Sequence, residues 1–105
     1  MLEKNTRGFR IIGAKGFHIT FANGYTVSVQ FGYGDYCISN QKTYNGTPPG
    51  GVASPDAEVA AWRADGSWLH PEGFDFGGDD VIGCLSPEEV ARFIQAVASM
   101  EAPDA

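Results

Sequence analysis

The side chains whose types could do chemistry in this sequence are a group of carboxylates, two histidines and two cysteines. Asp75, Asp79 and Asp80 lie close together in the chain with Glu72 nearby, and hard cations need several such carboxylates at one place. Their spacing does not fit the EF-hand pattern, so we interpret the group as a solvated acidic loop, with an interaction surface as the functional alternative. The sequence predicts no metal or other cofactor.

The histidines and cysteines are His18, His70, Cys37 and Cys84, and their spacing fits neither a zinc site nor a catalytic pair. His18 alternates with apolar residues, so we expect its ring to point away from the core, at an exposed position. We interpret the two cysteines as reduced, buried thiols, because an unbridged cysteine behaves as a small hydrophobic residue. The domain is predicted not to be an enzyme.

A second candidate surface is the long connection over residues 32–56, which contains many glycines and prolines. It interleaves tyrosines with small polar residues, a composition typical of protein-binding loops, because a tyrosine ring offers contact area at low entropic cost. The alternative is that these rings fold back over the sheet. The predicted partner-binding residues of the two candidate surfaces are Tyr33, Asp35, Tyr36, Tyr44, Glu72, Asp75, Asp79 and Asp80.

The strands that must position these groups are indicated by alternating apolar and polar residues. Residues 17–21 and 25–31 alternate in this way, and residues 9–12 form a shorter candidate strand. A two-residue turn between them would put apolar and polar side chains on one face. A three-residue loop with Gly24 in the left-handed region pairs Phe21 with Tyr25 and keeps the apolar side chains together. A three-stranded meander is therefore predicted.

The second half of the chain predicts another hairpin. Residues 58–63 and 67–69 flank Ala64, Asp65 and Gly66, and the same loop geometry places Trp62 opposite Trp68. A helix that begins near residue 54 is the alternative, but the Asp65–Gly66 break leaves it short. Residues 81–85 are a brief apolar run after a stretch rich in glycine and aspartate.

A C-terminal helix has the clearest local signal. Ser86 as N-cap, Pro87 at the first helical position and Glu89 form a capping box, and the helix is expected to end near Met100. One apolar stripe should face the sheet, formed by Val90, Phe93, Ile94 and Val97. The predicted fold class is α+β: an antiparallel sheet of two or more β-hairpins with one C-terminal helix packed on one face.

Length and charge limit the function further. The 105 residues predict a single domain over 1–105, with 1–8 and 101–105 as flexible ends. No apolar run is long enough to span a membrane and no secretory signal is visible, so a cytoplasmic location is expected. Residues 51–105 carry eleven acidic and two basic side chains, whereas residues 1–50 carry two acidic and five basic ones. This balance argues against direct nucleic-acid binding and favours a protein partner with a basic surface.

Several segments resemble small uncharacterised proteins that tailed phages and prophages encode, over about residues 17–98. The resemblance is in residues 19–32, 36–37, 60–62, 65–68 and 85–91. It implies a phage origin and a host-cell cytoplasm setting, and it assigns no activity. By analogy with small acidic phage proteins, we expect a non-enzymatic accessory protein that binds and inhibits a host defence protein, of the CRISPR type or another nucleic-acid-handling one. The alternatives are a phage assembly protein that self-associates, for example as a homodimer, and a small-ligand or metal-binding protein.

Overall fold

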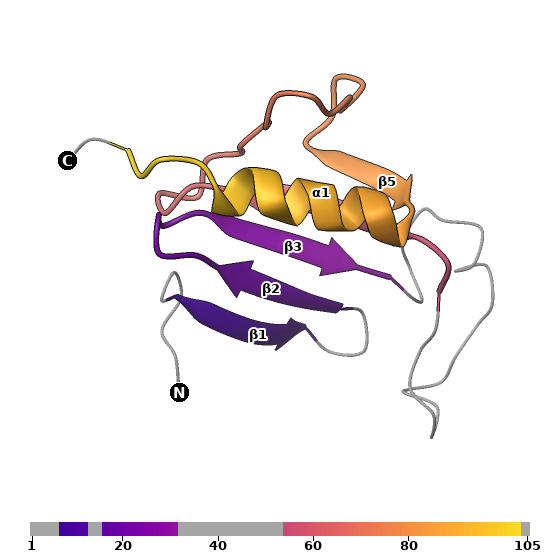
Figure 1. Cartoon of the computed structure of the whole chain (residues 1–105), viewed down its shortest axis with the longest axis horizontal. Helices are drawn as coiled ribbons and strands as arrows, with labels where there is room; N and C mark the ends of the chain where they lie inside the picture. The colour runs from indigo at the N-terminus through magenta and orange to yellow at the C-terminus, as the bar shows by residue number, and fades with distance from the viewer. Residues whose placement is uncertain (1–6, 13–15, 32–53, 104–105) are drawn as a thin grey trace.

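The computed structural model describes residues 7–12, 16–31 and 54–103. In these residues, five strands form one antiparallel sheet, and a single helix lies across one face (Figure 1). The strands follow one another across the sheet in chain order: β1 (Gly8–Ile12), β2 (Gly16–Thr20), β3 (Thr26–Gln30), β4 (Ala57–Trp62) and β5 (Val81–Leu85). The helix is α1 (Pro87–Ala98). The predicted α+β class is confirmed.

The hairpin between β2 and β3 has the predicted three-residue loop. The Phe21 N–H donates to the Tyr25 carbonyl and the Gly24 N–H donates to the Phe21 carbonyl, each over 2.9 Å, and Gly24 has a φ of 90°. The register pairs Ile19 with Val27, as the apolar pattern requires. With β1 paired to β2, the predicted meander over the first three strands is confirmed.

The second predicted hairpin is only partly present. Trp62 and Trp68 form an isolated antiparallel bridge, but residues 67–69 do not continue as a strand. Pro71 follows closely, and a proline cannot donate a hydrogen bond to a ladder, so the chain leaves the sheet there. The place beside β4 is taken by β5, over the residues that the sequence indicated only as an apolar run. The helical alternative near residue 54 is wrong, because residues 57–62 form β4.

Helix α1 begins with the predicted capping box. The Ser86 hydroxyl accepts from the Glu89 N–H over 3.2 Å, and the Glu89 carboxylate accepts from the Ser86 N–H over 2.9 Å. The bonds that the Glu89 carboxylate accepts from Ser86, the one from the backbone N–H above all, lower the pKa of this carboxyl. The helix ends at Ala98, two residues before the expected Met100.

The core lies between α1 and the adjacent face of the sheet. Phe93 and Val97 of the predicted helical stripe are fully buried, and they pack against apolar side chains of the inner strands. The sheet contributes chiefly Val27, Val29, Val59 and Ala61. Because α1 contacts β3, β4 and β5, strands β1 and β2 extend past the helix (Figure 1). No helix in the described part of the chain is long and apolar enough to cross a membrane.

Candidate functional site

The acidic residues predicted as a binding surface lie in the connection between the Trp62–Trp68 bridge and β5. We call residues 70–80 the acidic loop. Glu72, Asp75 and Asp79 are exposed in it, and Asp80 is half-buried at its end, next to Val81. The other predicted partner-binding residues, Tyr33, Asp35, Tyr36 and Tyr44, lie outside the described residues, so their prediction stays untested.

Two phenylalanines fix the acidic loop to the helix. The ring centroids of Phe74 and Phe76 lie 5.1 Å and 6.2 Å from that of Phe93, which is fully buried. Asp75 lies between Phe74 and Phe76 in the chain and is exposed. The loop therefore makes apolar contacts to the core and keeps its carboxylates in solvent. These contacts offset the conformational entropy that is lost when the carboxylates are ordered.

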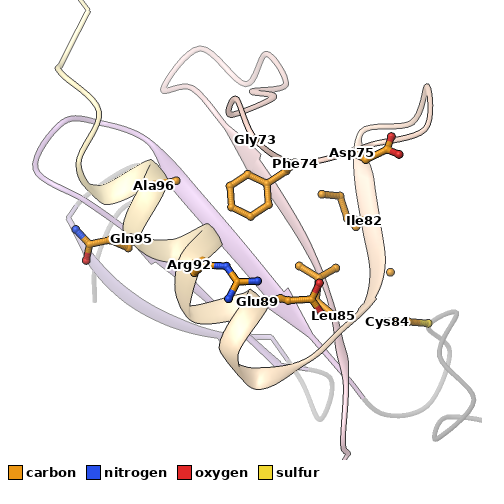
Figure 2. A pocket seen from close by; sticks show the side chains of 11 residues that line it. Gly73, Phe74, Asp75, Ile82, Cys84, Leu85, Glu89, Arg92, Gln95 and Ala96 are labelled. Carbon is orange, nitrogen blue, oxygen red and sulfur yellow. The ribbon is translucent and has the colours of Figure 1, made fainter.

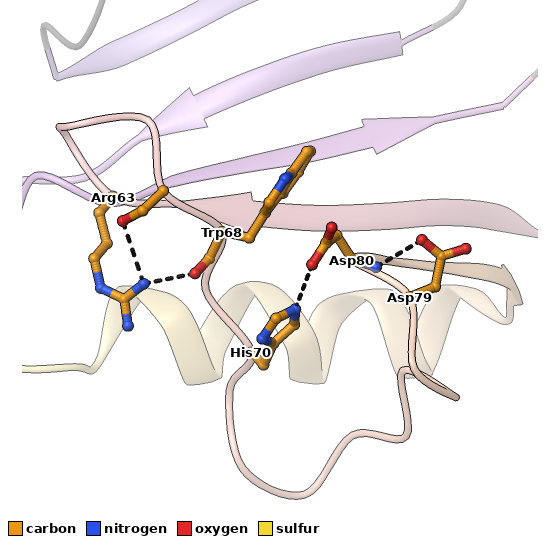
Figure 3. A network of polar contacts seen from close by, with 6 residues as sticks. Arg63, Trp68, His70, Asp79 and Asp80 are labelled. Carbon is orange, nitrogen blue, oxygen red and sulfur yellow. Dashed lines mark hydrogen bonds and ion pairs between the residues drawn. The ribbon is translucent and has the colours of Figure 1, made fainter.

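Local hydrogen bonds orient three of the four carboxylates, and Figure 3 shows those of Asp79 and Asp80. Asp75 accepts from the Gly77 N–H over 2.9 Å, and Asp79 accepts from the Asp80 N–H over 2.7 Å. The Asp80 carboxylate lies 2.8 Å from Nε2 of His70, whose ring also packs edge-on against Phe76 at 4.8 Å. Each of these bonds engages one carboxylate oxygen, so the groups stabilise the loop and still present negative charge.

The His70–Asp80 pair invites a catalytic interpretation, which the surroundings do not support. A carboxylate can orient an imidazole, but nucleophilic catalysis also needs a hydroxyl or thiol within hydrogen-bond reach of the ring. The described residues that line the hollow beside this pair include no serine, threonine or cysteine. The described residues also hold no group of three histidine, cysteine or acidic side chains placed for a metal ion.

A groove of about 660 Å³ separates the acidic loop and β5 from α1 (Figure 2). Phe74 and Ile82 line its apolar side, and Glu89 and Arg92 of the helix line its polar side. Cys84 also lines it and is exposed, so the prediction of a buried thiol is wrong at this position. Cys84 lies on an edge strand, where a side chain is covered on fewer sides than in the middle of a sheet.

The opposite face of the sheet carries an aromatic cluster, of which the sequence predicted the pairing of Trp62 with Trp68 but not the contact with His18. The His18 ring packs edge-on against Trp62 at 4.9 Å, and Trp62 packs edge-on against Trp68 at 5.9 Å. His18 points away from the core as predicted but is half-buried, and this burial, with the charge of Arg10, lowers its pKa. Trp68 is 45% exposed, and Arg63 donates to its carbonyl over 2.6 Å (Figure 3).

Comparison of the chain with protein-family models, with curated proteins and with solved structures finds no match.

Proposed function

We propose that this chain is a non-enzymatic binding protein whose acidic loop docks on a basic surface of a partner protein. The finer part of the proposal follows the resemblance described above: the partner is a host defence or other nucleic-acid-handling protein, and occupation of its basic surface inhibits it. Such proteins bind the phosphate backbone with lysine and arginine, so a rigid group of carboxylates can compete for the same surface.

The observation that supports this proposal most is the way in which the acidic loop is held. Phe74 and Phe76 anchor it on Phe93, and Asp75 and Asp79 accept backbone N–H bonds within it. A loop that is ordered before binding loses less conformational entropy on binding than a disordered acidic segment. The carboxylates are therefore presented in a fixed arrangement, which is what recognition of a particular basic surface requires.

The test replaces three carboxylates by amides. A triple variant with Asp75→Asn, Asp79→Asn and Asp80→Asn keeps an acceptor oxygen at each position, so the local bonds persist while the charge is removed. The matched control removes the same charge at exposed positions elsewhere, through Asp65→Asn, Glu88→Gln and Glu101→Gln. Both variants and the parent protein are assayed against a panel of purified CRISPR effector complexes and other DNA-binding nucleases.

We expect the parent protein to bind one member of the panel and to inhibit its DNA binding. The loop variant should bind about tenfold more weakly through a lower association rate, and the control should stay within about twofold. Affinity of the parent protein should also fall steeply between low and physiological salt. Equal affinities of the loop variant and the control would refute the assignment of the acidic loop. Failure of the parent protein to bind any member would refute the proposed class of partner.

A further inference from the structure

The groove between the acidic loop, β5 and α1 has an apolar wall that is only half-buried. Phe74 of the loop and Ile82 of β5 form this wall, and Figure 2 shows their side chains directed into the space between β5 and the helix. Ala96 lines the groove from the helix and is also half-buried. The volume of about 660 Å³ lies within the range of ligand pockets, about 300 to 1,000 Å³. The groove can therefore admit a large apolar side chain.

The charge around this groove is negative. Asp75 lines it from the acidic loop, and Glu89 and Arg92 line it from the helix, so two carboxylates stand against one guanidinium. Glu72 and Asp79 add further exposed carboxylates in the same loop. In the part of the chain that the structure describes, none of the carboxylates of Glu72, Asp75 and Asp79 forms an ion pair with a lysine or arginine. An apolar group is therefore favoured here when it arrives together with positive charge.

Local hydrogen bonds hold the two carboxylates of the groove in place without removing their charge. Asp75 accepts from the Gly77 N–H over 2.9 Å, and Glu89 accepts from the Ser86 N–H over 2.9 Å. Both donors are neutral backbone groups, so each side chain keeps its negative charge. The bonds from Ser86 also lower the pKa of Glu89, which keeps it ionised at neutral pH. A cationic segment therefore meets one fixed carboxylate from the loop and one from the helix.

We propose that this groove binds a leucine-like apolar side chain of the partner protein that is flanked in the partner by lysines or arginines. The inference rests on the proposed function, because the flanking cations are the groups that the acidic loop attracts. The apolar side chain would pack on Phe74 and Ile82, and the cations would lie near Asp75 and Glu89. Exposed charges chiefly raise the association rate, whereas an apolar side chain buried in a pocket slows dissociation. The groove thus adds affinity that the acidic loop alone does not provide.

Charge distinguishes this occupant from the other candidates. Arg92 could attract an anionic ligand, but Asp75 and Glu89 line the same groove, and residues 51–105 carry eleven acidic against two basic side chains. A second copy of the chain that docked through this surface would bring two acidic loops together, and like charges repel. A basic partner with an apolar side chain gains both from the apolar wall and from the surrounding carboxylates.

The experiment compares two capped peptides of equal charge, Lys-Lys-Leu-Lys-Lys and Lys-Lys-Ser-Lys-Lys, titrated into the ¹⁵N-labelled protein and followed by NMR. We expect the leucine peptide to shift the amides of Phe74, Ile82 and Ala96 and to bind about fivefold to tenfold more tightly, as burial of part of a leucine side chain implies. The serine peptide should bind more weakly, with shifts confined to the acidic loop. A third peptide, Glu-Glu-Leu-Glu-Glu, should bind more weakly than both.

Two variants test the groove itself. Ala96→Phe fills it and should reduce binding of the leucine peptide to the level of the serine peptide, with serine-peptide binding unchanged within about twofold. Ala98→Phe is the matched control, because Ala98 is exposed at the same end of the helix and does not line the groove, so both affinities should persist. Ile82→Thr keeps a β-branched side chain on the strand and removes apolar contact without added bulk, so it should also weaken binding of the leucine peptide alone.

The outcomes separate this inference from the proposed function. Equal affinities of the leucine and serine peptides would overturn the inference, while attraction of basic peptides to the acidic loop would still support the proposed function. Equal affinities of the two leucine peptides would contradict the requirement for flanking cations. Binding of neither basic peptide would overturn the inference, and the panel of nucleases would still decide the proposed function. Dimerisation in sedimentation that Ala96→Phe abolishes would show a second copy in the groove and would also overturn it.

Discussion

Asn23, in the loop between β2 and β3, links the sheet to the end of the helix. Its replacement tests how much this link stabilises the fold. Its side-chain N–H groups donate to the carbonyls of Val97 and Met100, each over 2.9 Å. Its side-chain oxygen accepts from the Tyr25 N–H over 3.0 Å. The Val97 carbonyl also accepts from the Met100 N–H over 3.2 Å, so the Asn23 amide adds a second bond there and connects the turn after the helix to the hairpin.

The expected magnitude follows from these three bonds. A net contribution of about 1 kcal/mol for each partly buried hydrogen bond gives a loss of about 2 to 3 kcal/mol for Asn23→Ala. For a domain of this size, that corresponds to a fall in melting temperature of roughly 10 to 20 °C. Gln95→Ala is the matched control, because it removes an exposed amide from the same end of the helix and should cost less than about 0.5 kcal/mol.

Asn23→Asp separates the donor role from the acceptor role. The new carboxylate can still accept from the Tyr25 N–H, but at neutral pH it donates nothing and faces two carbonyls at the negative end of the helix. Folding should therefore raise the pKa of this carboxyl, so that the variant loses stability as pH rises from about 4 to 7. Urea denaturation measured by circular dichroism over this range gives the free energies of unfolding. An Asn23→Ala loss below about 0.5 kcal/mol, or a pH-independent deficit of Asn23→Asp relative to Asn23→Ala, would refute the reasoning.

Two further predictions concern the sheet. At Gly16, with a φ of 150°, an added Cβ would lie 2.0 Å from the Val29 carbonyl oxygen, so Gly16→Ala should cost about 3 kcal/mol or more in urea denaturation. Gly66→Ala, also at a positive φ but with open space around it, should cost only about 1 to 2 kcal/mol, and equal losses would contradict the contact. Burial and the charge of Arg10 hold the pKa of His18 below its ordinary 6.5, so the unfolded state binds a proton more readily than the folded state. The free energy of unfolding should therefore fall as pH drops through 6.5. His18→Gln should remove this part of the pH dependence, and an unchanged profile would refute it.

The parts of the fold that the sequence predicts are those that neighbouring residues determine. The alternation of apolar and polar residues on both sides of Asn23 and Gly24 sets the β2–β3 hairpin, because only one loop length places all apolar side chains on one face. Ser86 and Glu89 set the start of the helix for a similarly local reason. The contact of Asn23 with the end of the helix was not visible, since it joins residues that are more than 70 positions apart.

The position of β5 and the contact of His18 with Trp62 could not be predicted for the same physical reason. Residues 81–85 form a strand because β4 offers them an edge, and the choice between this partner and residues 67–69 depends on the packing of the whole sheet. Contact of His18 with Trp62 requires the register of β3 with β4, across the long connection of residues 32–56. The acidic residues of the loop were readable from sequence, but their anchoring by Phe74 on Phe93 was not.

The acidic loop and Arg10 lie at opposite edges of the sheet, and their separation makes them electrostatically independent. The acidic loop adjoins β5, and Arg10 lies on β1 at the other end of the strand order. Four inter-strand spacings of about 4.8 Å separate these edges by roughly 19 Å. This is more than twice the Debye length of about 8 Å at physiological ionic strength, so charges at one edge are largely screened at the other. Arg10→Glu should consequently leave binding at the acidic loop unchanged within about twofold at 0.15 M salt, and a larger change would mean that the partner contacts both edges of the sheet.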